Sequence, residues 1–367
     1  MDKKNIDEFE NVKLSNLKGL DLKDLLECIK NTKIEYRKKL EIPRNVTFGL
    51  EIEVNSVINT SPANFIKQSL PYYMYVGIDK FEFQEFLYSK LHMYRSNGKI
   101  DSNWTVISDG TVDAEIVSPI LRDYQKTWNE VKTVCEVLKE SDCTANLASA
   151  AHVHIGAHSL GSDPKSWLNL MKIWLAYEKI IMKFGYGERI GHDQTFRDSE
   201  GTNYPLILET KEEMRERMWS LAWNVKVGRK LNEKQIRKII MNDERRTSIN
   251  FQNFYYFDFD KDSKNTIEYR CALGTIEEAI WQNYVNAFAK LTLACKDNNL
   301  DEDVIEKRLK EFNNKNNEYS EYPKIFVDEA LEFCDLIFSN PLDKIYFLKQ
   351  YIRDFTEEKE PVKRFIK

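Results

Sequence analysis

The stretch of sequence that decides the fold is Thr47-Phe48-Gly49-Leu50-Glu51-Ile52-Glu53-Val54. Its apolar and acidic residues alternate. Because side chains of a strand alternate between two faces, the pattern predicts a strand with Glu51 and Glu53 on one face. The same spacing recurs in His152-Val153-His154 and in Glu268-Tyr269-Arg270. An inward-pointing carboxylate or imidazole is costly unless it is paired or bound to a metal. We therefore expect three strands to line one concave polar surface, with ligands for hard divalent cations and a phosphate-binding arginine.

Each of these segments also has a simpler interpretation when it is taken alone. The two glutamates of the first strand could be the solvated face of an antiparallel strand, and the two histidines could be structural. Glu268 and Arg270 could form a cross-strand ion pair of little energetic consequence. Asp109 and Glu115 add another pair of equal parity along the next predicted strands. Coincidence of all four pairs in this order explains the sequence less well than a shared site.

The composition is that of a packed globular protein. Hydrophobic residues make up 42% and charged residues 31% of the 367 residues, and the formal net charge is −5. This acidic balance argues against a general attraction to nucleic acid or anionic lipid. No apolar run approaches the roughly 20 residues that span a bilayer, and the first residues lack the apolar core of a signal peptide. We therefore expect a cytoplasmic protein without a nucleic acid or membrane partner.

The sequence offers neither a reactive cysteine motif nor a common phosphate-binding loop. Its six cysteines are scattered and none forms a CxxC pair, which favours buried free thiols over a zinc site or a disulfide framework. We find no convincing catalytic triad and no GxxxxGK[ST] motif. A nucleotide would therefore be bound by another route.

Hydrophobic periodicity and turn residues predict the order of the elements. Strands are expected over residues 46–57, 104–107, 113–117, 151–157, 247–257 and 266–272. Helices are expected over about 124–139, 164–184, 210–243, 275–297, 301–313, 326–338 and 342–355. Turns are expected at Asp109-Gly110 and at residues 260–263, and a mainly helical insertion at 62–98. Residues 185–205 are expected to form a long irregular loop, of the kind that is commonly functional or disordered.

The ordered set of motifs resembles the amidoligases, a branch of the glutamine synthetase-like carboxylate–amine ligases. The matching segments are Phe48 to Glu53, Asp109 with Glu115 to Pro119, Ala151 to Gly156, Arg246 to Asn250, and Thr266 to Arg270. Each motif is short, but their order is specific, and the resemblance covers about residues 46–298.

The resemblance implies an α+β fold, a glutamine synthetase-like curved antiparallel sheet with helices on its outer face. Together with the predicted elements, the resemblance divides the chain into three regions. These are a helical N-terminal extension (1–45), an amidoligase-like catalytic domain (46–298) with an insertion at about 62–98, and a C-terminal helical region (299–367).

The resemblance further implies two Mg²⁺ sites and an ATP site. The ligands of one Mg²⁺ would be Glu53, Asp109 and Glu115. Those of the second, which bridges the phosphates of ATP, would be Glu51, His152 and Glu268. Asp109 is shorter than the glutamate that glutamine synthetase places there, so it could bind through water. Tyr269 replaces a more usual phenylalanine, which a strand core should tolerate.

The remaining site residues implied by the resemblance contact the nucleotide or the substrate. His154 and Asn250 would lie near the nucleotide, and Arg246 and Arg270 would neutralise phosphoryl oxygens. An arginine of the 185–205 loop, Arg189 or Arg197, would capture the substrate carboxylate or help close the loop over the site. The simpler interpretation of this segment is an ordinary charged surface loop.

These residues suit an ATP-dependent ligase that forms an amide or isopeptide bond through an acyl phosphate. Phosphoryl transfer depends on positioning and charge neutralisation more than on a covalent nucleophile. The expected substrates are a carboxylate and an amine carried by amino acids, peptides or proteins. The alternatives are a phosphotransferase on the same fold, a non-catalytic peptide-binding protein, and a metal hydrolase that acts without ATP.

Overall fold

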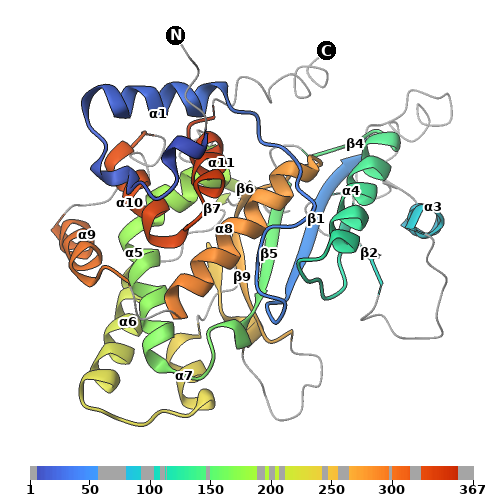
Figure 1. The fold of residues 1–367 in the computed structure, drawn as a ribbon. Coiled ribbons are helices and arrows are strands. Elements are labelled where there is room, and N and C mark those ends of the chain that lie inside the picture. Colours follow the sequence, from blue (N-terminus) through green and yellow to red (C-terminus); the bar gives the residue numbers. More distant parts are fainter. Residues whose placement is uncertain are drawn as a thin grey trace. The chain divides into compact units, whose positions relative to one another are not determined.

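The protein has a mixed α+β fold built on an open, curved antiparallel sheet, which confirms the predicted fold class (Figure 1). The computed structural model describes residues 6–56, 80–91, 103–107, 112, 114–145, 149–187, 195–197, 203–205, 211–241, 247–254, 264–296, 300–314 and 324–353. Within the described residues, the sheet has seven strands. They are β1 (Phe48–Ser56), β2 (Thr105–Ile107), β3 (Ala114–Val117), β4 (Cys143–Thr144), β5 (Ala150–Gly156), β8 (Ile249–Asn250) and β9 (Thr266–Leu273). Their order is β2-β3-β1-β5-β9-β8, and β4 pairs with β1.

The helices lie mainly in the later part of the chain. They are α1 (Gly19–Asn31), α3 (Lys80–Leu91), α4 (Gln125–Glu140), α5 (Pro164–Tyr186), α6 (Lys211–Lys226), α7 (Glu233–Ile240), α8 (Glu278–Lys296), α9 (Glu302–Asn314), α10 (Val327–Ile337) and α11 (Pro341–Tyr351). Among the described helices, none has both the length and the apolar character needed to cross a bilayer. Contacts group the chain into two compact units. The first comprises Met1–Glu35, His154–Ala272 and Asn283–Glu357, and the second comprises Tyr36–Val153, Leu273–Gln282 and Glu358–Lys367.

In the second unit, the apolar face of β1 packs against α4. Phe48, Leu50 and Ile52 are buried on this face, and Phe48 stacks on Trp128 of α4 with ring centroids 5.3 Å apart. Because side chains alternate along a strand, Glu51 and Glu53 project from the opposite face. The helix therefore covers the side of β1 that carries no acidic residue.

A buried carboxylate fixes the entry to β1. Asp123 accepts hydrogen bonds from the backbone N–H of Leu40 (2.8 Å) and of Ile42 (3.0 Å), and from the indole N–H of Trp128 (2.7 Å). A buried carboxylate is stable when such donors replace water. Asp123 thus ties the segment before β1 to the start of α4.

In the first unit, β9 packs against α5 and α8 through Tyr269. Its ring stacks on Phe288 of α8 at a centroid distance of 4.5 Å and lies 5.8 Å from Trp174 of α5. Its hydroxyl lies 2.8 Å from the hydroxyl of Thr292. A strand core thus accommodates the tyrosine, and Glu268 and Arg270 project from the face of β9 that these helices leave open.

Two predicted elements, over residues 210–243 and 247–257, differ from the structure. The helical stretch predicted over 210–243 is two helices, α6 and α7, because Gly228 adopts a φ of +66° and Asn232 begins α7 with a capping box. A left-handed backbone cannot continue an α-helix. The strand predicted over 247–257 is limited to β8, after which a 3₁₀ helix, η7 (Gln252–Phe254), turns the chain.

The described parts of the loop predicted over 185–205 contain regular structure. Helix α5 extends through Tyr186, and β6 (Thr195–Arg197) pairs with β7 (Asn203–Pro205) in a small antiparallel hairpin. The predicted strand pair around residues 104–117 is confirmed by β2 and β3. The turns predicted at 109–110 and 260–263, and most of the predicted 62–98 insertion, lie outside the described residues.

Gly185 provides a test of the close packing of α5 on β9. A methyl group on Gly185 would lie 1.6 Å from the carbonyl oxygen of Cys271, a backbone atom of β9. We expect Gly185→Ala to reduce the free energy of unfolding by about 3 kcal/mol or more, measured by urea denaturation, because neither backbone can yield. Gly161→Asn is the control, since the space around Gly161 is open and asparagine tolerates its φ of +74°. Equal effects of the two substitutions would contradict this packing.

Candidate functional site

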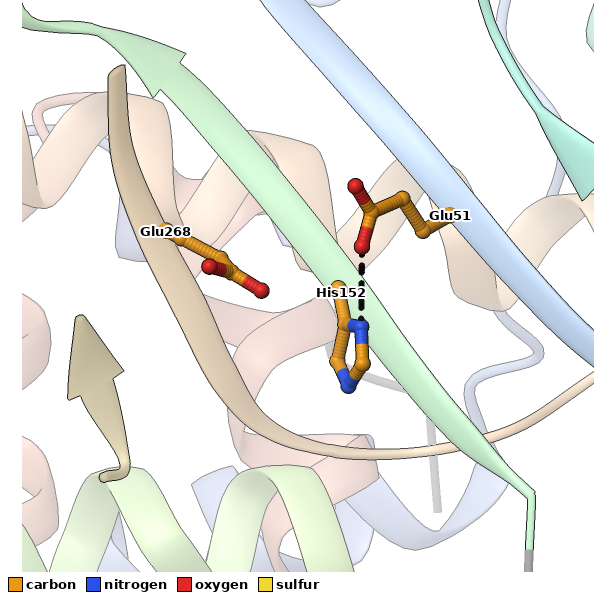
Figure 2. Close-up of side chains that lie close together, drawn as sticks. All are labelled: Glu51, His152 and Glu268. Carbon is orange, nitrogen blue, oxygen red and sulfur yellow. Dashed lines mark hydrogen bonds and ion pairs between the residues drawn. The ribbon is translucent and has the colours of Figure 1, made fainter. Parts of the chain in front are cut away.

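Three buried polar side chains converge from β1, β5 and β9. Glu51, His152 and Glu268 each offer one ligand atom, and these atoms all lie within 4.8 Å of one another (Figure 2). The same three residues are those that the sequence resemblance assigns to one Mg²⁺. Two carboxylates and an imidazole at this spacing could serve together as ligands of a divalent cation.

In the second unit, His152 lies between the two glutamates of β1. Its Nδ1 is 3.1 Å from Oε2 of Glu51, the contact drawn in Figure 2, and its Nε2 is 3.7 Å from Oε1 of Glu53. The other oxygen of Glu53 accepts the backbone N–H of Ala150 at 2.7 Å. Glu53 pairs in register with Glu115 of β3, so two carboxylates occupy adjacent positions on neighbouring strands. Like charges directly opposite one another destabilise a sheet, and a bound cation would offset this cost.

In the first unit, Glu268 accepts hydrogen bonds from Asn250, Asn253 and Arg270. Nδ2 of Asn250 and Nδ2 of Asn253 both donate to Oε2, at 2.7 Å and 2.8 Å. Arg270 donates from one guanidinium nitrogen to Oε1 at 2.5 Å. Asn250 and Arg270 are residues that the sequence resemblance assigns to the nucleotide site, and both contact a predicted metal ligand.

His154 makes its contacts with β9. Its Nδ1 lies 2.9 Å from the hydroxyl of Thr266, and its Nε2 lies 4.0 Å from Oε1 of Glu268. The hydroxyl contact fixes the orientation of the ring. The two histidines of β5 therefore have different roles in the packing of the polar face, one beside the glutamates of β1 and one beside Glu268.

The burial of the acidic residues fits a cation site. Four carboxylates of the predicted ligand set are at most 8% exposed; they belong to Glu51, Glu53, Glu115 and Glu268. Burying a charge is costly unless it is paired, hydrogen-bonded or bound to a metal. Oxygen ligands together with one imidazole suit Mg²⁺ or Mn²⁺, whereas zinc often binds thiolates. The Glu51, His152 and Glu268 group therefore fits a magnesium ion of the kind that the resemblance implies.

Several predicted site residues lie outside the described residues, namely Asp109, Arg189 and Arg246. The backbone of Arg197 is part of β6. Their roles stay predictions. The sequence motifs did not single out Asn253, Thr266 or the backbone N–H of Ala150 as polar partners. The signal for Asn253 was its position three residues after Asn250, although only the 3₁₀ turn brings it back to Glu268.

The cysteines take no part in this group. All six are free thiols. Burial raises the pKa of the thiols of Cys135, Cys271, Cys295 and Cys334 far above the usual range. These four are therefore protonated at neutral pH and are not nucleophiles.

Comparison with known families agrees with the motifs. A family model described as "putative amidoligase enzyme" matches residues 44–292, and the chain belongs to this amidoligase family. Membership indicates a ligase-type enzyme. No curated protein and no solved structure gives a significant match.

The convergence of Glu51, His152 and Glu268 predicts a divalent-cation response. We expect saturating Mn²⁺ to raise the melting temperature of the wild-type protein, since a ligand at about 100 times its Kd stabilises by about 2.7 kcal/mol. Glu51→Gln should lose most of this shift, because it removes one charged ligand. Glu329→Gln is the control: it breaks the 2.9 Å ion pair with Lys179 and should lower the melting temperature while keeping the Mn²⁺ shift. A full Mn²⁺ shift in Glu51→Gln would contradict the cation site.

Proposed function

We propose that the protein is an ATP- and Mg²⁺-dependent ligase that joins a carboxylate to an amine through an acyl phosphate. The observation that carries the proposal is the buried Glu51, His152 and Glu268 group in a chain of the amidoligase family. A ligase of this kind must neutralise the phosphates of ATP and hold them beside the substrate carboxylate. Buried carboxylates that bind Mg²⁺, next to an arginine, meet that requirement.

In this proposal, Glu51, His152 and Glu268 hold one Mg²⁺, and Glu53, Asp109 and Glu115 hold a second. Bound Mg²⁺ supplies charge neutralisation at the phosphate oxygens. The protein's own part is to fix the ligands and orient the reactants. The 2.7 Å bond from Ala150 to Glu53 and the amide donors on Glu268 restrict the rotation of two of these carboxylates.

The proposed reaction has two steps. A substrate carboxylate oxygen attacks the γ-phosphorus of ATP, the bond from that phosphorus to the β,γ-bridging oxygen breaks, and ADP leaves. The amine nitrogen then attacks the acyl carbon, the C–O bond to phosphate breaks, and the amine proton passes to a base or to solvent. Neither step requires a serine or cysteine nucleophile, in keeping with the protonated thiols of β9 and the helices.

We assign Arg270 to transition-state stabilisation at the phosphoryl group. Its ion pair with Glu268 fixes the guanidinium beside a metal ligand, and its side chain is 22% exposed, so a ligand can reach it. Arg246 shares this role in the proposal, and Arg189 or Arg197 binds the substrate carboxylate. His154 and Asn250 lie beside Glu268 and contact the nucleotide.

The proposal is tested by trapping the acyl phosphate. With ATP, Mg²⁺ and a screen of amino acids and peptides as carboxylates, hydroxylamine should yield an acyl hydroxamate detectable by mass spectrometry. Glu268→Ala and His152→Ala should abolish this product while circular dichroism shows a folded protein, because loss of one ligand unbalances the cation site. Near wild-type turnover in either folded variant would refute the metal assignment.

Amide formation with persistent failure to trap a hydroxamate would favour an adenylate route. ATP consumption that phosphorylates the substrate without ligation would favour a phosphotransferase.

Arg270→Lys distinguishes a catalytic from a structural arginine. Lysine keeps the charge but loses the planar fork, so we expect kcat to fall by roughly 10²–10³-fold with little change in nucleotide affinity. Arg308→Lys is the matched control. Arg308 donates to both oxygens of Glu332, each at 2.7 Å, so its replacement should lower the melting temperature and leave kcat unchanged. A wild-type kcat in Arg270→Lys, with only a lower melting temperature, would show that Arg270 is a structural ion-pair partner.

A further inference from the structure

The amide groups that donate hydrogen bonds to Glu268 bear on which metal ion the site selects. We propose that Glu268 binds its cation through Oε1 alone, because Asn250 and Asn253 occupy Oε2. Asn253 is then a positioning residue that makes the site prefer Mg²⁺ or Mn²⁺ over Ca²⁺. This inference rests on the proposed function, since it requires Glu268 to be a metal ligand.

The two oxygens of Glu268 have different surroundings. Oε2 accepts N–H groups from Asn250 at 2.7 Å and from Asn253 at 2.8 Å. A carboxylate oxygen offers about two lone-pair sites, so these two bonds use the capacity of Oε2. Oε1 accepts the bond from Arg270 and faces Nε2 of His154 at 4.0 Å. We therefore assign Oε1 as the oxygen of Glu268 that would contact the cation.

The backbone presents both amides to the same oxygen. Asn250 lies opposite Glu268 in the register of β8 and β9. Its Oδ1 accepts the backbone N–H of Gln252 at 2.8 Å, which directs its Nδ2 toward Glu268. One turn of η7 then returns Asn253 to the same carboxylate. Amides are neutral donors, so they orient the carboxylate without neutralising it, whereas the charged donor Arg270 bonds to Oε1.

One-oxygen ligation matters for the choice of metal. Ca²⁺ accepts six to eight oxygen ligands in flexible geometry and often takes a carboxylate through both oxygens, whereas Mg²⁺ demands a compact octahedron. A glutamate whose second oxygen is held by two amides cannot become bidentate without breaking those bonds. The two amide bonds to Oε2 thus raise the cost of binding Ca²⁺ and orient the single ligand oxygen for an octahedral ion.

The test is a metal-affinity ratio that does not depend on catalysis. Mn²⁺ affinity of the full chain is measured by electron paramagnetic resonance, and Ca²⁺ affinity by competition with Mn²⁺. In Asn253→Ala we expect Mn²⁺ affinity to fall by about tenfold, as is usual for loss of a residue that orients a metal ligand. Ca²⁺ affinity should fall less or rise, so the Mn²⁺ to Ca²⁺ affinity ratio decreases. Asn253→Ser also removes the amide and should change the affinity ratio in the same way. It replaces the alanine variant in the test if that variant does not fold.

Asn169→Ala is the matched control. Asn169 of α5 is buried and donates from its Nδ2 to the carbonyl oxygen of Cys295 at 3.0 Å, so its replacement also removes one amide hydrogen bond in the first unit. It should lower the melting temperature and leave the Mn²⁺ to Ca²⁺ ratio unchanged. A wild-type ratio in a folded Asn253 variant would overturn the inference and leave the proposed function standing. Mn²⁺ affinity that does not change in Glu268→Ala would overturn the metal role of Glu268 itself, and with it both proposals.

Discussion

Buried negative charge on one face of a sheet is the constraint on which the rest of the structure depends. Glu51, Glu53, Glu115 and Glu268 are all buried. Such a face persists when hydrogen bonds and a cation balance its charge. The protein supplies the hydrogen bonds from a backbone N–H at Ala150 and from the amides beside β9. Divalent cations are the partner that we propose for the remaining charge.

The opposite faces of these strands are built for rigidity. Phe48 on Trp128 and Tyr269 on Phe288 are stacked ring pairs that fix β1 and β9 on their helices. A strand that is held by large buried rings cannot rotate, so the alternating polar residues keep their direction. Rigid support of this kind is what a ligand set needs, because metal and phosphoryl sites depend on sub-ångström positioning. The apolar residues between the glutamates are therefore as necessary to the site as the glutamates themselves.

Much of the fold and of the candidate site could be predicted from local patterns. Side chains alternate along any strand with a period of two. The polar and apolar faces of β1 and β9 can therefore be predicted from Glu51-Ile52-Glu53 and Glu268-Tyr269-Arg270 without knowledge of the tertiary structure. What could not be predicted was set by single backbone angles. The left-handed Gly228 divides a continuous helical pattern into two helices, and η7 shortens the strand at Asn250. Asn253 reaches Glu268 only because of that turn, so its contact had no periodic signal in the sequence.

We propose that the polar face of the sheet holds divalent cations for phosphoryl transfer. Anomalous X-ray diffraction from crystals grown with Mn²⁺ and a non-hydrolysable ATP analogue tests it most directly. We expect a manganese peak within coordination distance of Glu51, His152 and Glu268, with phosphate oxygens completing the coordination shell of the metal. A map without a peak at these residues under saturating Mn²⁺, or nucleotide bound on another surface of the protein, would contradict it.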